Sequence, residues 1–353
     1  MSNRFVRKRA IKIALISVII LLIVIGGGWA LLRSYIRPPE IPVAETNPTQ
    51  TATPSPADDA TPDIPEQGAE MPHLNPTENW ERKPDFFTFL IFGLDDTLNA
   101  DSIMIAAYDA VAQRAYILSI PRDTRVDVER PVGLRKIVVA YPTGLEQGGH
   151  EYGVEQLKQE VQMLIGFRPD FYISVEDMAF ISLVDAVGGV EIYVPFHMQY
   201  DDPYQDLHID IPAGLQVLDG ENALHFVSYR LGNDHRYSIT DHQRIRHQHQ
   251  LLSTLFQDLL RPQSLLQIPT LVRTYYNHVG SNLSLGNKLW FGEQFLRIGD
   301  VDAITIYTIP IAGSSGAPGW YELPYVPGLL ELINRTINPF TQDITADMLR
   351  IAA

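Results

Sequence analysis

Charged side chains stand at the ends of apolar runs in this sequence. The stretch "LSIPRDTRV" (118–126) is an apolar run that stops at Pro121 and continues into Arg122 and Asp123. Proline cannot donate a hydrogen bond within a sheet, so a strand should end there and project Arg122 beyond it. Because a guanidinium can bind a phosphate or carboxylate through two parallel hydrogen bonds, this strand end is suited to an anionic ligand.

Two aspartates flank the first predicted hairpin. The run "FFTFLIFG" (86–93) is followed by Asp95, and Asp101 stands just ahead of the next run, "SIMIAAYD". Two carboxylates across a tight turn could share a divalent cation, and oxygen ligands with open water positions suit Mg²⁺. The alternative is that both acids are solvated or cap the turn, which is the commoner situation on spacing alone.

A third polar group lies on a predicted helix, in "DHQRIRHQHQLL". Asp241, Arg244 and Gln248 recur at i, i+3 and i+7 and therefore share one face. An acid, a guanidinium and an amide on one face could bind phosphate, and Arg230 lies shortly before them. A solvated helix face with internal ion pairs is the alternative that the pattern alone favours.

Alternating strands and helices must position these side chains. Further strands are expected at 114–120, after a hairpin at Ala110–Gln113, and at 171–175, 190–195 and 303–310. Helices are expected at 154–165 with Gly166 as cap, at 176–187, after Asp219 as N-cap, at 240–260 and at 327–337. Helices between strands predict a layered α/β domain with a central sheet, and ligands of such sheets bind beyond strand ends.

The N-terminal segment predicts a membrane anchor. Residues 1–12 carry five bases and no acid, and residues 13–32 are 20 residues without a charge. Such a helix is about 30 Å long, the thickness of the hydrocarbon layer of a bilayer. The positive-inside rule makes residues 1–12 a cytoplasmic tail and places the rest outside, as a single-pass protein of the cell membrane. A cleaved signal peptide is the alternative, but the apolar run exceeds the usual length.

Composition divides the remaining chain. Residues 38–84 hold 11 prolines, nine acids and two bases, so residues 33–84 are expected to form a disordered linker. Residues 85–340 form the predicted extracytoplasmic domain and 341–353 a C-terminal tail. Because the charges of residues 1–84 cancel, the domain carries the net charge of −15, which argues against nucleic acid as a partner. The chain has no cysteine, which excludes disulfides and thiolate chemistry.

The order of these motifs resembles the LytR-CpsA-Psr family of membrane-anchored cell-wall glycopolymer transferases, over roughly residues 85–338. The resemblance is carried by segments that include "FLIFGLDD", "ADSIMIAAYD", "LSIPRDTRV", "KIVVAYPTG", "LVDAVGGVEIYVP" and "DHQRIRHQHQLL". It implies a central mixed sheet flanked by helices on both faces. It also implies transfer of an anionic glycopolymer from a polyprenyl-pyrophosphate carrier to peptidoglycan, by attack of a hydroxyl on phosphorus.

The resemblance further implies roles for individual residues. Family members hold Mg²⁺ between the pyrophosphate and two aspartates that match Asp95 and Asp101. Pyrophosphate-binding positions match Arg122, Lys136, Arg230, Arg244 and Gln248, and Asp123 and Asp241 are candidate general bases beside the catalytic Arg122. A polyprenyl tail also needs an elongated apolar pocket, for which the candidate linings are 154–165, 178–187 and 251–259.

Five family positions are replaced in this chain, namely Thr97, Asn99, Val138, Ser228 and His247. Each lost charge-assisted hydrogen bond to phosphate costs about 1.5–3 kcal/mol, although a protonated His247 could partly replace an arginine. Two hypotheses follow: an active phosphotransferase, or a catalytically weakened envelope protein that binds polyprenyl-linked glycan or peptidoglycan. The sequence specifies neither the glycopolymer nor the oligomeric state.

Overall fold

The computed structural model describes residues 36–41, 77, 80–95, 98–131, 134–202, 207–230, 232–233, 237–261, 278–315 and 320–351. The expected cytoplasmic tail, the expected membrane helix 13–32 and most of the proline-rich segment 33–84 lie outside these residues. Across the part of the chain that is described, no helix combines the length and apolar character needed to cross a bilayer.

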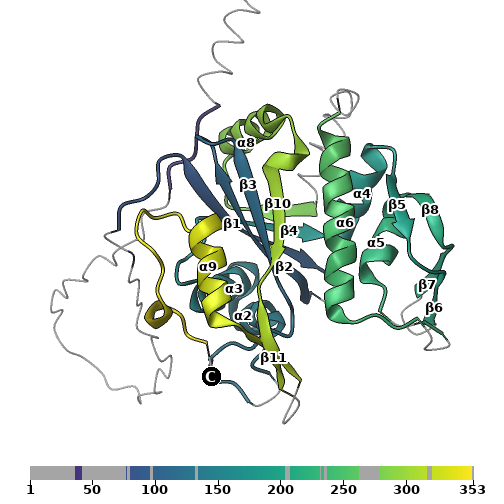
Figure 1. Ribbon diagram of the computed structural model, residues 1–353, viewed down its shortest axis with the longest axis horizontal. Helices are drawn as coiled ribbons and strands as arrows, with labels where there is room; N and C mark the ends of the chain where they lie inside the picture. The colour runs from purple at the N-terminus through teal and green to yellow at the C-terminus, as the bar shows by residue number, and fades with distance from the viewer. Residues whose placement is uncertain are drawn as a thin grey trace, which may run out of the picture.

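A mixed sheet forms the centre of the described structure (Figure 1). Its six strands have the order β10-β3-β2-β1-β4-β9, with antiparallel pairing of β1–β2, β2–β3 and β4–β9 and parallel pairing of β1–β4 and β3–β10. The expected hairpin joins the second and third strands. The strands are β1 (Phe86–Leu94), β2 (Ala100–Asp109), β3 (Arg114–Ile120), β4 (Phe171–Glu176), β9 (Val279–Ser281) and β10 (Ile304–Thr308).

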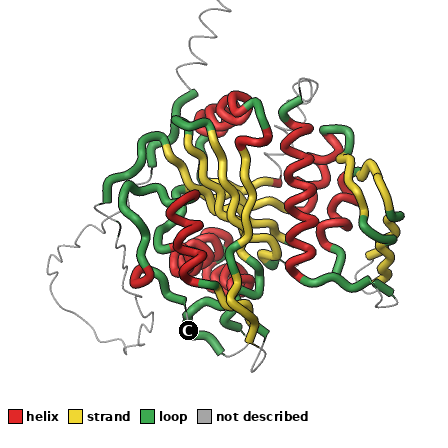
Figure 2. Tube along the Cα trace, viewed as in Figure 1, coloured by secondary structure: helices red, strands yellow, loops and turns green. Residues whose placement is uncertain are grey.

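Helices cover both faces of this sheet, as Figure 2 shows, so the predicted α/β architecture is confirmed. One face packs on α2 (Ala140–Gly148), α3 (His150–Ile165) and α9 (Val326–Thr336), through a core that includes Leu90, Phe92 and Ile105. The other face packs on α8 (Leu285–Ile298), where Phe87 meets the rings of Trp290 and Phe291 at 5.4 and 5.3 Å. Short 3-10 helices lie at η1 (Ile137–Val139), η3 (Val301–Ala303) and η4 (Ala346–Met348).

A second lobe lies beside the sheet, and α6 is its element nearest to the sheet (Figure 1). It consists of α4 (Asp177–Ala186), α5 (Gly220–Ser228), α6 (Asp241–Leu259) and the hairpins β5 (Val190–Val194) with β8 (Gly214–Leu218) and β6 (Met198–Asp202) with β7 (Leu207–Ile211). Ile192, Ile209, Phe226 and Leu251 fill its separate core. The hairpin β11 (Ile311–Ser315) with β12 (Tyr321–Pro324) follows β10.

Local chemistry sets the helix ends that the sequence predicts. Gly166 closes α3 in the left-handed conformation at φ 80°, and the Asp219 side chain accepts the Asn222 N–H at the start of α5. Thr240 and Gln243 form a reciprocal capping box at the start of α6. The predicted helices at 154–165, 176–187, 240–260 and 327–337 are therefore present, and α3 begins earlier, at His150.

The packed body extends beyond the expected domain limits of 85 and 340. The Asn287 Nδ2 donates to the Arg37 carbonyl at 3.3 Å, and Ile41 packs on the aromatic cluster under α8. At the other end, Ile344 and Leu349 are buried in the main core. These residues escape sequence prediction because isolated apolar side chains among prolines and polar residues carry no helix or strand period.

Candidate active site

A cavity of about 570 Å³ lies between the sheet and the second lobe and is lined by residues of both. The sheet contributes Ile91, Met104 and Val175, and α6 contributes residues in the order Arg244, Gln248, Leu251 and Leu252. Because these positions follow one another along a helix, the cavity is charged near the start of α6 and apolar farther along it. The cavity can therefore receive a ligand with an anionic head and a hydrocarbon tail.

Three arginines that are distant in sequence meet in this cavity, as the sequence predicts. Arg122 follows the end of β3, Arg230 follows α5, and Arg244 lies in the first turns of α6, and all three line the cavity. The loop between α5 and α6 is closed by a hydrogen bond from the Ile239 N–H to the Arg230 carbonyl at 2.8 Å. This bond keeps Arg230 beside the start of α6.

Arg122 is held in place by an ion pair and by its own backbone. Its Nη1 lies 2.8 Å from the Asp101 carboxylate, and its carbonyl accepts the Val138 N–H at 3.2 Å. Burial is the largest influence on this guanidinium, but the attraction of Asp101, Asp123 and Asp241 outweighs it and raises the pKa of Arg122. Its buried Nε has no hydrogen-bond partner among the described residues.

An irregularity in β2 turns Asp101 toward the cavity. Gly93 pairs with Ser102 and Leu94 with Ala100, so Asp101 is an extra residue in the ladder. In a regular strand Asp101 would lie on the same face as Ile103, which packs in the main core, because alternate residues share a face. The bulge instead places its carboxylate in the cavity lining, beside Arg122.

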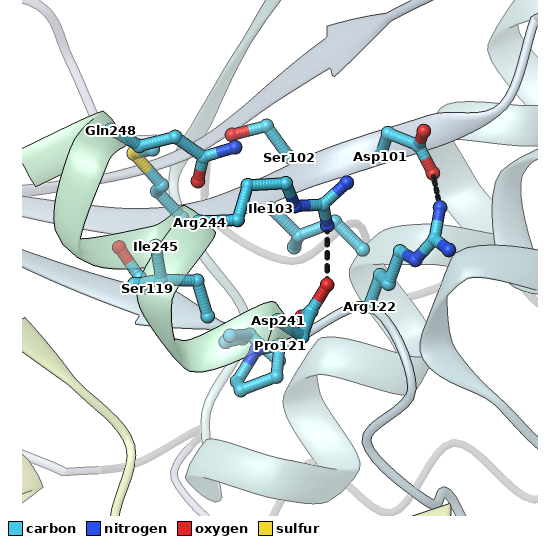
Figure 3. Close-up of a pocket in the computed structure, with 12 residues that line it drawn as sticks. Asp101, Ser102, Ile103, Ser119, Pro121, Arg122, Asp241, Arg244, Ile245 and Gln248 are labelled. Carbon is cyan, nitrogen blue, oxygen red and sulfur yellow. Dashed lines mark hydrogen bonds and ion pairs between the residues drawn. The ribbon is translucent and has the colours of Figure 1, made fainter. Parts of the chain in front are cut away.

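Arg244 is buried against its own helix. Only 4% of the residue is exposed, and its Nη2 lies 2.8 Å from Asp241 one turn earlier. Burial lowers the pKa of Arg244, Asp241 opposes this, and the nearby positive charge of Arg122 adds to the lowering. Figure 3 shows both ion pairs in a small recess that Gln248 also lines. A buried cation and a half-buried one held close together favour an anionic ligand between them.

The two aspartates expected to hold Mg²⁺ both line the cavity. Asp95 shapes the β1–β2 turn, because its Oδ1 accepts the Asn99 N–H at 2.9 Å. Within the described ranges, no group of three or more His, Cys, Asp or Glu residues suited to a metal gathers. A pair of carboxylates with phosphate and water as further ligands is a donor set that Mg²⁺ takes, so these residues fit the ion.

Lys136 and Asp123 lie behind Arg122 rather than in the cavity wall. The Lys136 Nζ is 2.8 Å from the Asp123 carboxylate, and neither residue lines the cavity or the recess. The carboxylate of Asp123 is therefore paired with a lysine from outside its own loop. The pair joins the loop after β3 to the residues just before η1.

Glu322 is a buried acid at the site that sequence reasoning missed. Its N–H donates to the Asp123 carbonyl and its carbonyl accepts the Arg125 N–H, both at 3.0 Å, so β12 supports the loop after β3. Burial raises the pKa of Glu322, the neighbouring His242 opposes this, and the charges of Asp241 and Asp123 add to it. No local sequence pattern could identify Glu322, because β12 lies far along the chain from the loop after β3 that it supports.

The expected lipid pocket is lined by two of the three predicted helices. Phe180 of α4 and Leu251 of α6 contribute to it, whereas Val154 and Leu157 of α3 lie in the main core on the opposite face of the sheet. The prediction for 154–165 is therefore wrong, because an apolar stripe identifies a buried face but not the partner it packs against. The β6–β7 hairpin supplies lining that was not predicted: Tyr200, Leu207 and Ile209.

The replaced positions differ in their relation to the site. Ser228 lines the cavity, Asn99 closes the β1–β2 turn, and Val138 supports Arg122 through its backbone. Thr97 lies outside the described residues. Of the described positions, Ser228 is therefore the one where a lost arginine would have faced the ligand directly.

His247 does not replace an arginine in this structure. Its ring stacks on Phe226 with centroids 4.7 Å apart, and it is absent from the residues that line the cavity. Burial, followed by the positive charge of Arg246, lowers the pKa of His247. Its burial disfavours the charged form that would act as a cation, and the ring belongs to the contact between α5 and α6.

Comparison with known proteins agrees with this geometry. The chain is 24% identical to the regulatory protein MsrR of Staphylococcus aureus over 233 residues, and 27% identical over 224 residues to TagV of Bacillus subtilis, a polyisoprenyl-teichoic acid–peptidoglycan teichoic acid transferase. The alignments cover 64% and 61% of this chain, and they cover 65% and 54% of those relatives, so the chain spans less than two thirds of either.

Solved structures show the same fold. The crystal structure of gbs0355 from Streptococcus agalactiae matches with a TM-score of 0.61 at 18% identity, over 76% of this chain and 92% of that one. The family model LytR_cpsA_psr matches residues 54–324, which is more than half of the sequence. On the strength of that match and of the motifs it contains, the chain belongs to the LytR-CpsA-Psr family.

Proposed function

We propose that this protein is a membrane-anchored phosphotransferase that moves an anionic glycopolymer from a polyprenyl-pyrophosphate carrier to peptidoglycan. The observation that carries the proposal is a single cavity that joins three arginines to an apolar wall. A pyrophosphate fits the arginines, and burying ten CH₂ groups of a polyprenyl tail contributes about 8 kcal/mol. TagV, a relative by sequence, is named for a reaction of this class.

The reaction needs charge neutralisation and a proton acceptor. A peptidoglycan hydroxyl oxygen forms a bond to the phosphorus that bears the glycan, the bond from that phosphorus to the bridging oxygen breaks, and polyprenyl phosphate leaves. Arg122, Arg230 and Arg244 stabilise the charge on the phosphates, and Gln248 donates a hydrogen bond. We assign the hydroxyl proton to Asp241, because its carboxylate lines the same small recess as Arg122 and Arg244.

Two further pairs complete the proposed site. Lys136, held by Asp123, adds a positive charge behind Arg122. Asp95 and Asp101 would hold Mg²⁺ together with phosphate oxygens and water, and the ion would neutralise charge on the pyrophosphate. Asp101 also fixes the Arg122 guanidinium, so its carboxylate orients a cation in the absence of ligand.

The second candidate function is a binding protein without turnover. Ser228 favours it, because a hydroxyl lines the cavity at a position where the family resemblance implies an arginine. Loss of one charge-assisted hydrogen bond to phosphate weakens the transition state by about 1.5–3 kcal/mol, roughly a tenfold to hundredfold loss of rate. Binding can survive such a loss because the apolar wall is intact.

The test uses the full-length chain in liposomes that contain a lipid-linked pyrophosphate glycan, with added peptidoglycan. We expect glycan to appear on peptidoglycan together with an equal amount of polyprenyl phosphate, and chelation of Mg²⁺ to stop both. If the wild type binds the carrier without transfer and Ser228→Arg transfers, the binding function is correct. Absence of both binding and transfer in both proteins would contradict the assignment of the cavity.

A further inference from the structure

Residues 36–41 are fastened to α8, immediately after the segment that is expected to cross the membrane. The Asn287 side chain donates to the Arg37 carbonyl at 3.3 Å, Pro39 is buried, and Ile41 packs under α8. Only about five residues separate position 32 from this contact, and an extended chain of that length reaches at most about 17 Å. Given the anchor of the proposed function, on which this inference rests, α8 must lie close to the bilayer.

The outer face of α8 has the composition of a membrane-contacting helix. Leu285, Leu289, Gly292 and Leu296 recur at i, i+4, i+7 and i+11 and form one stripe, opposite the Trp290 side that packs on the sheet. Leu285 and Leu296 are 41% and 45% exposed, although they are large apolar side chains. A helix that is apolar on two sides has one side more than the described residues of its domain cover.

The turn between β2 and β3 lies against the sheet-facing side of α8. Gln113 in the turn donates to Gln294 of α8 at 3.4 Å, so the two elements are adjacent. Val111 at the tip is 68% exposed, and Lys288 borders the stripe. A lysine beside an apolar stripe suits the bilayer interface, because its stem covers apolar groups while its ammonium reaches the lipid phosphates.

We propose that the outer stripe of α8 docks the domain on the bilayer surface. The domain then sits against the membrane rather than being held away from it by residues 33–84. The same helix thus has two contacts, one with the sheet through Trp290 and Phe291 and one with lipid through Leu285 and Leu296.

This placement orients the cavity for a lipid-borne substrate. The far end of α6 touches α8, since the rings of Phe256 and Phe295 lie 6.1 Å apart, and both elements reach the same end of the molecule in Figure 1. From Arg244 to Phe256 the helix rises about 18 Å. Docking therefore points the apolar part of the cavity toward the bilayer, and the arginines lie farther out, where a pyrophosphate can reach them without the whole tail leaving the membrane.

Labels at single positions test the contact directly, because the chain has no cysteine of its own. We would place Leu296→Cys, or Val217→Cys as control, in the full-length chain in nanodiscs and attach a polarity-sensitive fluorophore. Val217 is 67% exposed on β8, at the outer edge of the second lobe and away from α8 (Figure 1). We expect quenching by spin-labelled lipids at position 296 and none at 217; equal, water-like signals would overturn docking.

A kinetic comparison separates docking from catalysis. The double variant Leu285→Gln, Leu296→Gln should raise the KM for a bilayer-borne carrier roughly tenfold and leave kcat, and the rate with a short water-soluble carrier, unchanged. The matched control is Leu215→Gln, Val217→Gln on β8, whose side chains are more exposed still, and it should change neither constant. An unchanged KM in the α8 variant would overturn docking.

The outcomes also distinguish this inference from the proposed function. Lipid quenching at position 296 in a protein that transfers nothing supports docking and contradicts the enzyme. Transfer activity with a water-exposed label at 296 contradicts docking and leaves the enzyme intact. Release of the full-length chain from membranes by alkaline wash would overturn the anchor and docking together.

Discussion

At the scale of single residues, the site depends on how each cation is paired. Arg122 and Arg244 are each held by one carboxylate at 2.8 Å, and each retains a buried Nε without a hydrogen-bond partner among the described residues. A guanidinium with one edge fixed and other donors unused is oriented before the ligand arrives. Preorganised charge of this kind stabilises a transition state without further rearrangement.

Substitution of Arg122 tests this arrangement. We expect Arg122→Ala to lower kcat for transfer roughly a hundredfold to a thousandfold, and Arg122→Lys to recover only part, because lysine cannot bind bidentately. The control is Arg125→Ala in the same loop, whose guanidinium lies over the Tyr321 ring at 5.8 Å, outside the cavity. Equal losses of kcat in the Arg122 and Arg125 variants would show a loop effect rather than a charge effect.

At the scale of elements, two helices with the same N-terminal cap serve different contacts. Thr240 and Gln243 cap α6, and Ser284 and Asn287 cap α8, in both cases through reciprocal side-chain and backbone hydrogen bonds. The first turns of α6 carry Asp241 and Arg244 into the site. The first turn of α8 instead faces residues 36–41.

The two caps form a matched pair of variants. Thr240→Ala and Ser284→Ala should each lower the free energy of unfolding by about 1 kcal/mol, because each leaves a backbone N–H of its helix without its acceptor. Only Thr240→Ala should also reduce kcat, since it loosens the turn that holds Arg244. Denaturant unfolding and steady-state transfer rates measure the two effects, and a similar kcat loss in Ser284→Ala would contradict the assignment of α6.

At the scale of the whole molecule, the site lies where separately packed regions meet, and buried ion pairs join distant segments. Glu160 of α3 is fully buried and is paired with Arg130 of the loop that leads to Lys136. Burial, only partly opposed by Arg130, raises the pKa of Glu160 from 4.5 to about 7. The folded state therefore binds a proton at this residue more tightly than the unfolded chain does.

The pH dependence of stability follows from this shift. The contribution of Glu160 to the free energy of unfolding is fully present below about pH 4.5 and is lost as pH rises through about 7. This change amounts to about 3 kcal/mol at most. We expect Glu160→Gln to remove this fall between pH 5 and 8. The control Glu155→Gln should act oppositely: Arg168 outweighs the effect of burial and lowers the pKa of Glu155, so that residue stabilises above its unfolded pKa. Urea unfolding between pH 5 and 8 measures the effect of Glu160, and unfolding below about pH 4.5, where the contribution of Glu155 is lost, measures the control. Parallel wild-type and Glu160→Gln curves between pH 5 and 8 would contradict the assignment.

The sequence by itself determined the elements and the types of side chain at their ends. Pro121 ends β3, Gly166 ends α3 and Asp219 begins α5, as expected, because caps and strand ends act within a few residues. The family motifs likewise identified Arg122 and Arg244 as neighbours, and the structure brings them to one cavity.

Tertiary structure alone decided which way these side chains face. Periodicity shows that a helix has an apolar face but does not name its partner, so α3 was expected at the cavity and packs in the main core instead. The extra residue in the β2 ladder places Asp101 on the other face of the sheet. The His247 ring stacks on Phe226 and does not line the cavity. Strand register, lobe packing and the approach of Glu322 depend on contacts between residues far apart in the chain, and no local sequence pattern records such contacts.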